Sequence, residues 1–285
     1  MGGLSGSRTY QLAIAGALGA IVGLYLTVEL VKVQGLWARD ALAGMFLGGM
    51  IGFFLNAAEP WRDGAWLKLA REGTAGTLAG AIGGAIGLLI GEFVLGGFQG
   101  GLMGRSVSWA ILGLGIGVSQ GLAHRSWQRL RLGLIGGGLG GLGGGFLFEL
   151  IRESLGPERY SISQGLGIVI LGAGLGLSLA LVEQALRRAW LVVLNGRQEG
   201  RIFLLGRSVS RIGLDERAEI GLFGDPGVSR RHGELRAQGD SFQFVPLDPA
   251  KPTAINGQPL DGPRLLRDGD RLELGRTLLV FRLRN

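Results

Sequence analysis

The side chains of this chain that could take part in chemistry form two sets. The first consists of Glu29, Glu92 and Glu149, which fall late in three long apolar runs. A carboxylate near a membrane interior is energetically costly, and such residues usually mark a functional site. Two interpretations stay open: the glutamates form a polar cluster that binds a cation, or they face headgroups and water at helix ends.

The second set lies between Val228 and His232, in the string VSRRH. Neither His232 nor His124, the other histidine, has triad partners in a recognisable motif, and the glycine strings lack the Gly-Lys-Ser/Thr sequence of a phosphate-cradling loop. With no cysteine and two histidines, a thiolate metal site is excluded and a zinc site is disfavoured. We therefore predict that the chain is not an enzyme and uses no metal ion or cofactor.

The composition indicates a membrane protein. The 285 residues give room for about two domains. They include 56 glycines and 47% hydrophobic residues, with a mean hydropathy of +0.33, and most of this bias lies before Leu191. The net charge is +7, but the cationic residues lie between apolar runs, as in membrane-facing loops, and no aromatic platform accompanies them. We expect a lipid bilayer, and not nucleic acid, as a partner.

Six apolar runs are long enough, or nearly so, to cross a bilayer as helices, for which about 20 residues suffice. They are Tyr10–Val31, Ala41–Ala57, Gly73–Gly97, Val107–Ala123, Leu132–Ile151 and Ile162–Leu181. The first run lacks a small-x-small cleavage site, which favours a membrane helix over a signal peptide.

The runs repeat one another at a regular interval. The odd runs share one glycine pattern, found at Gly16–Leu24, Gly80–Leu88 and Gly137–Gly144. The even runs share another, found at Ile111–Ser119, at Ile170–Ser178 and, more weakly, at Leu47–Gly52. The repeat predicts an all-α polytopic bundle built from three tandem helix hairpins.

Glycines in these runs recur every four residues, as at Gly19 and Gly23 and at Gly83, Gly87 and Gly91. Such spacing places them in one groove along a helix, where a neighbouring backbone can approach closely in lipid. Tight helix packing is one interpretation. A pore or carrier lined by bare backbone is the other.

Lysines and arginines near the ends of the runs are distributed unevenly between the two sides. One side has nine: Arg8, Arg62, Lys68, Arg71, Arg125, Arg129, Arg131, Arg187 and Arg188. The other has five: Lys32, Arg39, Arg105, Arg152 and Arg159. The positive-inside rule predicts a multi-pass protein of the cell inner membrane with both termini in the cytoplasm.

The last third of the chain has the pattern of a small all-β module. Asn256-Gly257 and Asp268-Gly269 are tight-turn dipeptides between alternating segments. Strands are expected at Leu191–Leu194, Arg201–Leu205, Ser208–Leu214, Ala218–Leu222, Glu234–Ala237, Ser241–Leu247, Ala254–Ile255, Arg271–Leu274 and Thr277–Arg284. They predict a two-sheet sandwich. The expected domains are residues 1–190, whose last helix runs through Trp190, and residues 191–285, with no flexible linker between them.

These strings, in this order, resemble the pattern of the forkhead-associated (FHA) domain. That pattern runs Ile-Gly-Arg, Asp-Pro-x-Val-Ser-x-x-His, Asn-Gly and Leu-x-x-Gly-Asp-x-x-x-x-Gly. Here it reads Ile212-Gly213-Leu214, Asp225 to His232, Asn256-Gly257 and Leu266 to Gly275. The resemblance covers about the last third of the chain.

The resemblance implies that a phosphothreonine binds loops at one end of the sandwich. Ser229 and Arg230 match two family positions that grip the phosphate, which needs a hydroxyl and a guanidinium for its strong acceptors. The family pattern also implies structural roles for a further four residues, Gly213, His232, Asn256 and Gly257.

Two positions depart from the family pattern. Leu214 replaces the arginine, and Ala250-Lys251-Pro252 replaces the Thr-Asn-Gly that clamps the peptide backbone. Arg217 or Arg211 could supply a guanidinium instead, and Lys251 a point charge. A charge-assisted contact is worth about 1.5–3 kcal/mol, so its loss weakens binding about ten- to a hundredfold. We expect weak phosphothreonine binding or none; a phosphate-independent protein contact is the other interpretation.

The function predicted from these features is a membrane-anchored FHA adaptor. The helical bundle would anchor or oligomerise the protein. The module would recruit a protein partner, with or without phosphothreonine, in Ser/Thr-kinase signalling or membrane assembly. The alternative is a channel or transporter regulated by the module.

Overall fold

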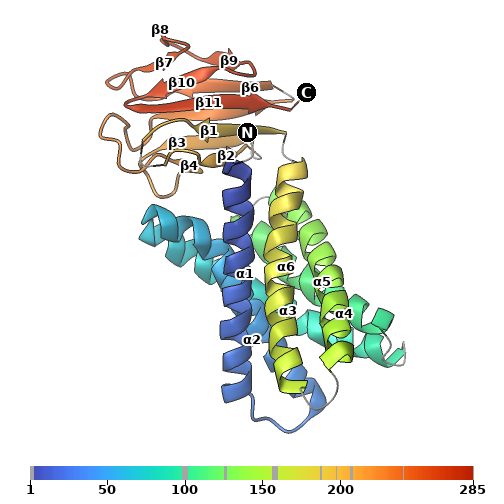
Figure 1. Cartoon of the computed structure of the whole chain (residues 1–285). Helices are drawn as coiled ribbons and strands as arrows, with labels where there is room; N and C mark the ends of the chain where they lie inside the picture. The colour runs from blue at the N-terminus through green and yellow to red at the C-terminus, as the bar shows by residue number, and fades with distance from the viewer. Residues whose placement is uncertain are drawn as a thin grey trace. The chain divides into compact units, whose positions relative to one another are not determined.

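The computed structural model describes residues 3–97, 102–124, 127–155, 160–186, 188–196, 198–205, 208–239 and 241–284. The chain divides into two compact units, Met1–Leu186 and Arg187–Asn285, and Figure 1 shows the helices of the first and the strands of the second. Each unit has its own apolar core.

The first unit is all-α, as predicted. Its helices are α1 (Gly3–Leu30), α2 (Leu36–Asp63), α3 (Trp66–Gly97), α4 (Leu102–His124), α5 (Trp127–Leu155) and α6 (Tyr160–Leu186). Within the described residues, five helices are long and apolar enough to cross a membrane, and α4 contains a shorter apolar stretch, Ser106–Leu122. Large apolar side chains such as Ile82 and Ile86 are exposed on the outside of the helices, as expected for contact with lipid.

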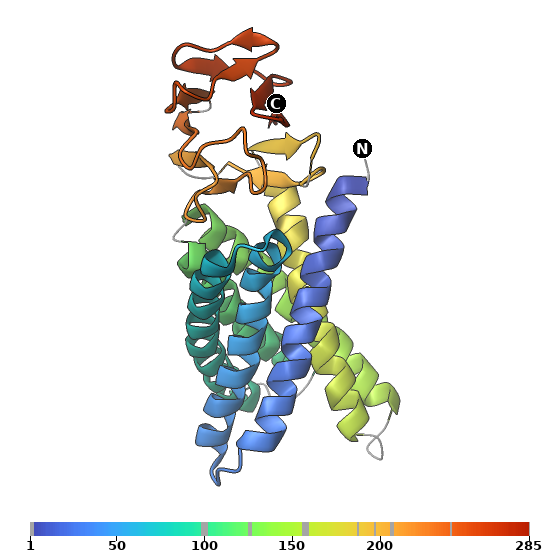
Figure 2. The same ribbon diagram turned by 90° about the vertical axis from the view of Figure 1, so that its left-hand side faces the viewer.

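The helices form a closed ring. Each helix packs against the next one in the chain, and α6 packs against α1 (Figure 2). Three glycine pairs make the contacts between neighbouring hairpins, and in each pair an added Cβ atom would overlap the partner's carbonyl oxygen. The pairs are Gly48 with Gly80, Gly113 with Gly137, and Gly172 with Gly16. These are equivalent positions of the repeat, so the three junctions between hairpins are made by the same kind of glycine contact.

Contacts within each hairpin repeat in the same way. A Cβ added to Gly23 would lie 2.9 Å from the Cα of Leu47, one added to Gly87 would lie 2.6 Å from the Cα of Leu112, and one added to Gly144 would lie 2.9 Å from the Cα of Leu171. The four-residue glycine spacing therefore serves close backbone packing, which confirms the first interpretation of these faces. The even helices place leucine and isoleucine at the equivalent buried positions, which join one apolar cluster: Leu47, Ile51, Leu112, Ile116, Leu171 and Leu175. These buried leucine and isoleucine side chains pack together, which does not favour a pore lined by bare backbone.

The three glutamates predicted as a set have different environments. Glu29 is exposed, Glu92 is half-buried and Glu149 is 1% exposed. A different charged set lies at the opposite end of the bundle. There the Arg8 guanidinium of α1 is 2.5 Å from a carboxylate oxygen of Glu59 on α2 and 2.9 Å from one of Glu183 on α6. This ion pair network joins the first and last hairpins of the ring.

The second unit is a sandwich of two sheets, as predicted. Its strands are β1 (Ala189–Val193), β2 (Ile202–Leu204), β3 (Val209–Gly213), β4 (Ile220–Gly221), β5 (Gly233–Gln238), β6 (Ser241–Pro246), β7 (Thr253–Ile255), β8 (Gln258–Pro259), β9 (Arg264–Leu266), β10 (Arg271–Leu274) and β11 (Thr277–Leu283). Sheet A has the order β2-β1-β11-β10-β7-β8, and sheet B has the order β4-β3-β5-β6-β9. Alternate residues such as Leu191, Phe244 and Phe281 fill the space between them.

The strand expectations were wrong in two places. Ala189 and Trp190 belong to β1 and not to the end of α6, because Ala189 pairs with Leu283 and faces the sandwich core. The boundary between the units therefore lies about four residues earlier than expected. Strands β8 and β9 were not expected, since they are short and lack clear alternation.

Candidate functional site

The loop between β4 and β5 contains the VSRRH string and rests on the end of β3. Gly213 is buried there, and a Cβ added to it would lie 2.8 Å from the carbonyl oxygen of Ser229 and would overlap that of Arg230. Backbone hydrogen bonds also join the end of β3 to this loop. Leu214 N–H donates to Ser229 O at 3.0 Å, and Asp215 N–H donates to Arg230 O at 3.2 Å. Gly213 is therefore required at this position because no side chain fits.

His232 holds this loop from inside. Its side chain is fully buried, its Nδ1 lies 3.3 Å from the Ser229 amide nitrogen, which donates to it, and its Nε2 lies 3.1 Å from Thr253 Oγ1. Burial lowers the pKa of the His232 imidazole; the nearby Asp248 carboxylate opposes this shift and Lys251 adds to it. The neutral ring can accept from the loop and donate to Thr253, which links the loop to β7.

Two further side chains fix the same loop. Lys251 Nζ donates to the carbonyl oxygens of Pro226 at 2.6 Å and Val228 at 3.2 Å. Asp225 accepts hydrogen bonds from Gly227 N–H at 2.8 Å, from Arg276 N–H at 2.8 Å and from Thr277 Oγ1 at 2.6 Å. Burial alone would raise the pKa of the Asp225 carboxyl, but these donors outweigh it and lower the pKa. The loop is thus anchored to the turn between β10 and β11.

Ser229 and Arg230 are displayed by this braced loop. The Ser229 hydroxyl lies 3.4 Å from His232 Nδ1 and its residue is half-buried, whereas Arg230 is exposed. Within the described part of the chain, the Arg230 guanidinium makes no hydrogen bond or ion pair. A hydroxyl and a guanidinium therefore lie next to each other in sequence on a loop of fixed conformation.

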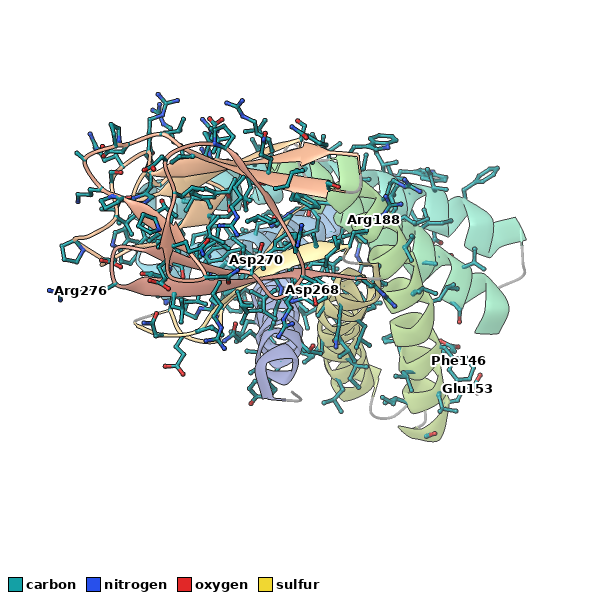
Figure 3. All side chains as sticks on the ribbon, turned by 90° about the horizontal axis from the view of Figure 1, so that it is seen from above. Phe146, Glu153, Arg188, Asp268, Asp270 and Arg276 are labelled. Carbon is teal, nitrogen blue, oxygen red and sulfur yellow. The ribbon has the colours of Figure 1, made fainter. Side chains whose placement is uncertain are left out.

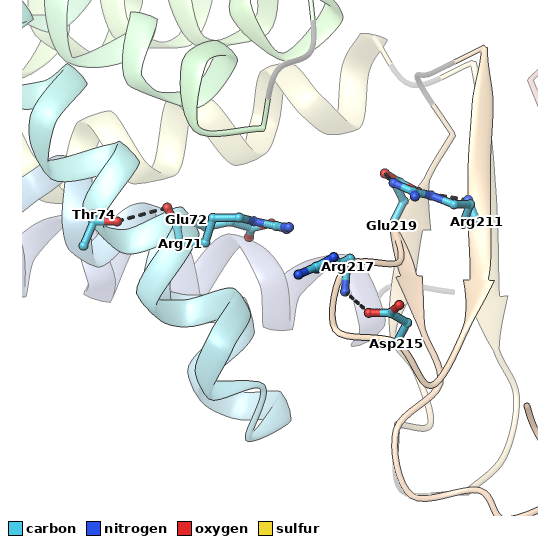
Figure 4. Close-up of polar contacts among 7 residues, drawn as sticks. All are labelled: Arg71, Glu72, Thr74, Arg211, Asp215, Arg217 and Glu219. Carbon is cyan, nitrogen blue, oxygen red and sulfur yellow. Dashed lines mark hydrogen bonds and ion pairs between the residues drawn. The ribbon is translucent and has the colours of Figure 1, made fainter. Parts of the chain in front are cut away.

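The two arginines predicted as substitutes for the missing guanidinium differ (Figure 4). Arg211 forms an ion pair with Glu219, whose carboxylate accepts hydrogen bonds from the Arg211 amide at 3.0 Å and from its Nε at 3.3 Å. Burial alone would raise the pKa of the Glu219 carboxyl, but these hydrogen bonds outweigh it and lower the pKa. Arg217 is exposed, and only its backbone amide is bonded, to Asp215 Oδ1 at 2.9 Å. Because Asp215 also bonds Arg230 O, Arg217 lies on a loop joined to the one that carries Ser229.

The Asn-Gly dipeptide forms a two-residue turn between β7 and β8. Asn256 has a φ of 54° and Gly257 a φ of 75°, the left-handed conformation that such turns require. The Asn256 side chain donates to Asp270 Oδ1 at 2.8 Å and accepts from the Arg271 amide at 2.8 Å. Asp270 is labelled in Figure 3, next to Asp268 of the second predicted turn. The dipeptide thus shapes the turn, and Asn256 ties it to β10.

Leu214 lies at the edge of the sandwich core. It is half-buried and packs against the apolar core, so an apolar contact stands at the position that an arginine occupies in the FHA pattern. The structure brings Ser229, Arg230 and the Arg217 loop together, uses Lys251 to hold loop carbonyls and pairs Arg211 with Glu219. The side chain of His124 lies outside the described residues.

Known proteins are similar to this unit of the chain. Residues 192–284 match the family described as the cytoplasmic domain of an inner membrane component of T3SS. The glycogen accumulation regulator GarA of Mycolicibacterium smegmatis is 38% identical over 93 residues, which cover 33% of this chain and 58% of GarA. The oxoglutarate dehydrogenase inhibitor of Corynebacterium diphtheriae is 37% identical over 91 residues, 32% of this chain and 62% of that protein. The chain thus spans less than two thirds of these relatives.

Solved structures match the same unit. One, of phosphothreonine-dependent FHA domain interactions, is 31% identical, with a TM-score of 0.32, and covers 34% of this chain and 98% of its own. Another, the FhaA FHA domain complexed with the intracellular domain of Rv3910, is 32% identical, with a TM-score of 0.31, and covers 33% of this chain and 99% of its own. The C-terminal third of the chain is an FHA domain.

The sequence pattern did not predict the roles of two residues of the FHA domain. Asp225 was noted only as part of the motif, although it is the residue that ties the Ser229 loop to the β10–β11 turn. Thr253 was not noted at all, although it pairs with His232. The Asp-Pro-Gly sequence at Asp225 is a turn signal that could have indicated the first. Thr253 is 21 residues from its partner, and no local signal marks it.

Proposed function

We propose that this protein is an inner-membrane FHA adaptor that recruits a phosphothreonine-bearing protein partner at the cytoplasmic face. The observation that carries this proposal is the braced loop that presents Ser229 and Arg230. A solved relative of this domain is described as part of phosphothreonine-dependent FHA interactions. The family description as an inner membrane component and the apolar helices support the location.

The phosphate would be held by Ser229 and Arg230, with Arg217 as the third contact. Arg217 and Arg230 have guanidiniums without partners in the described residues and lie on loops joined by the Asp215–Arg230 backbone bond. A guanidinium and a hydroxyl match the strong acceptors of a phosphate dianion. Leu214 offers no charge, so the affinity should be lower than in domains that have an arginine there.

The binding end of the FHA domain lies away from the point where the chain enters it. β11 begins at Thr277, which bonds Asp225 of the binding end, and ends at Leu283, which pairs with Ala189 at the start of β1. Six residue steps along a strand span about 20 Å. Arg276 and Arg188, labelled in Figure 3, mark these two ends of the domain. This separation would leave the binding end accessible to a protein partner.

A capture experiment tests the adaptor function. The FHA domain, immobilised, is exposed to a lysate with and without prior phosphatase treatment, and bound proteins are compared. We expect a partner whose capture is lost after phosphatase treatment and in Ser229→Ala, but is retained in Ser241→Ala. Ser241 is the matched control because it is an exposed serine at the start of β6, at the other end of the domain. Capture that survives phosphatase and Ser229→Ala would refute a phosphate-dependent function.

The proposed topology places both termini in the cytoplasm, from the nine-to-five bias of lysine and arginine. Arg125, Arg159 and Arg187 in that count lie outside the described residues. Reporter fusions after Arg131 and at the C-terminus are expected to report the cytoplasm, and a fusion after Arg159 the outside. A C-terminal reporter on the outside would contradict the proposed access to kinases.

A further inference from the structure

The two sheets of the FHA domain have different outer faces. On sheet A, the outward residues of three adjacent strands are mostly apolar and form what we call the sheet A patch. Its residues are Trp190 and Val192 of β1, Ile202 and Leu204 of β2, and Leu278 and Val280 of β11. Val280 is 7% exposed, and the other five are half-buried. The strand register makes them neighbours, since Trp190 pairs with Leu204 and Val192 with both Ile202 and Val280.

The outer face of sheet B serves as the internal comparison. Its outward positions on β3, β5 and β6 are mostly polar: Arg211, Glu234, Arg236, Gln238, Ser241 and Gln243, with Val209 and Val245 among them. When one face of a sheet packs on the core and the other is solvated, apolar inward residues alternate with polar outward residues along each strand. The sheet A patch lacks such a mixture of polar and apolar residues. Because its residues face away from the sandwich core, packing in that core does not explain why they are apolar.

Arginines border the patch at the end where the chain enters the domain. Arg282 pairs across the strands with Trp190, and its guanidinium also lies 3.5 Å from a carboxylate oxygen of Asp268. Arg188 and Arg284 are exposed and joined by a backbone hydrogen bond of 2.7 Å. Arg271 and Glu273, also exposed, pair with Val280 and Leu278 at the side of the patch. Tryptophan and arginine around an apolar surface are the residues that favour the headgroup region of an anionic bilayer.

The covalent chain limits how far this end can lie from a membrane. Gly165–Gln184 of α6 is an apolar span with a mean hydropathy of 2.3, and α6 ends at Leu186. β1 begins at Ala189, so three residue steps separate the two, which is at most about 11 Å of extended chain. Trp190 and the arginines beside it are therefore confined to the headgroup region if α6 crosses the bilayer.

We propose that the sheet A patch docks on the anionic phospholipid surface of the membrane that contains α6. Docking buries the apolar patch among headgroups and acyl chains and pairs its arginines with lipid phosphates. The occupant is lipid and not a second copy of the chain, because the continuity from α6 and the bordering arginines both favour an anionic bilayer. This inference rests on the membrane location of the proposed function but is independent of phosphothreonine binding.

Site-specific labelling of the full-length protein tests the docking. Since the chain has no cysteine, Leu204→Cys on sheet A and Val245→Cys on sheet B can each be labelled with one fluorophore. Both positions are half-buried, outward-facing and apolar, which makes them matched. The labelled proteins are placed in nanodiscs of phosphatidylglycerol or phosphatidylcholine that contain headgroup-nitroxide lipid, and quenching is measured.

We expect the Leu204→Cys label to be quenched severalfold more than the Val245→Cys label in phosphatidylglycerol nanodiscs. Adding Arg282→Gln and Arg284→Gln should reduce the docking equilibrium constant by roughly fivefold for each arginine, the equivalent of about 1 kcal/mol each. Equal quenching at the two positions would overturn the proposal. So would a Leu204→Cys label that is shielded from water but unquenched, with energy transfer between two labelled copies, because a second chain would then cover the patch.

The same samples separate this inference from the proposed function. Failure of the protein to enter nanodiscs would refute the membrane location and the docking together. Phosphothreonine peptide binding, titrated on the same nanodiscs, is expected to be unchanged by Arg282→Gln and Arg284→Gln, since both residues lie at the end of β11 remote from Ser229. Loss of peptide binding in these variants would show that the patch belongs to the binding function, which also contradicts an independent lipid contact.

Discussion

The helical bundle and the FHA domain are packed in opposite ways. In the bundle, the closest contacts are made where side chains are missing, and Gly48 touches Gly80 backbone to backbone. In the FHA domain, Leu191, Phe244 and Phe281 fill the space between two sheets with large side chains. The difference follows from the solvent. Water drives apolar side chains together, whereas lipid does not, so helices in lipid depend on close backbone packing.

Glycine therefore has a different structural role in each of the two units. A glycine in the bundle marks a helix–helix contact, because a Cβ would overlap the facing backbone. Gly275 in the FHA domain has a φ of 61° and turns the chain between β10 and β11. Its presence there reflects backbone conformation as well as the close approach of Gly227.

Replacing bundle glycines with a large residue should have the largest effect. In Gly83→Leu with Gly87→Leu, the added side chains would collide with the backbone at Gly115 and Leu112, so helices α3 and α4 would separate. We expect loss of a monodisperse, folded protein in detergent, measured by size-exclusion chromatography and thermal unfolding.

Gly143→Leu is the matched control for this double substitution. Gly143 lies on α5 in the same glycine-rich sequence, but nothing lies within 4 Å of an added Cβ. We expect this variant to retain the elution volume and unfolding temperature of the natural protein. If Gly83→Leu with Gly87→Leu behaved like Gly143→Leu, the backbone contacts would not hold the bundle together.

The buried carboxylate of the FHA domain offers a second, smaller effect. Asp225→Ala leaves the donors at Gly227, Arg276 and Thr277 without their shared acceptor. Hydrogen bonds to a charged group are worth about 1.5–3 kcal/mol each, so we expect the free energy of unfolding of the domain to fall by at least about 3 kcal/mol in urea titrations. The bundle should be unaffected, because Asp225 belongs to the other unit. A loss below about 0.5 kcal/mol, the range of surface substitutions, would show that the loop is not anchored in this way.

The smallest effect is a pH dependence of the FHA domain. The pKa of His232 is lowered from 6.5 in the folded state, so below that pH the unfolded chain binds a proton that the folded domain does not. The free energy of unfolding should therefore decrease as the pH falls from 7 to 5. In His232→Gln this part of the pH dependence should disappear. A domain that is equally stable at pH 7 and pH 5 would contradict the buried neutral imidazole.

The sequence predicted local features of both units well because short-range spacing determines them. The four-residue glycine spacing indicated packing faces, and the repeat indicated hairpins. Closure of the ring through Gly16 and Gly172 could not be predicted, because it depends on the angles at which three hairpins meet. The Arg8 network with Glu59 and Glu183 was missed for the same reason, since its members are up to 175 residues apart.

In the binding site, the motif located Ser229, Arg230 and His232 but did not determine what their neighbours do. Lys251 was predicted as a possible phosphate contact, yet its ammonium holds two loop carbonyls. Leu214 was treated as a missing arginine, whereas the structure shows that it packs against the core. Both outcomes depend on contacts between distant segments that no local pattern reports. Because Leu214 is only half-buried, Leu214→Arg should strengthen phosphate binding, at the cost of the apolar contact with the core.

Titration of phosphothreonine peptides against the FHA domain tests the central claim most directly. A degenerate peptide library, in phosphorylated and unphosphorylated forms, is titrated against the natural domain, Ser229→Ala and Leu214→Arg. We expect weak binding that requires phosphate, about a tenfold or greater loss in Ser229→Ala, and a gain of similar size in Leu214→Arg, from the worth of one charge-assisted contact. Binding that is unchanged by removal of the phosphate, or retained in full by Ser229→Ala, would contradict the account.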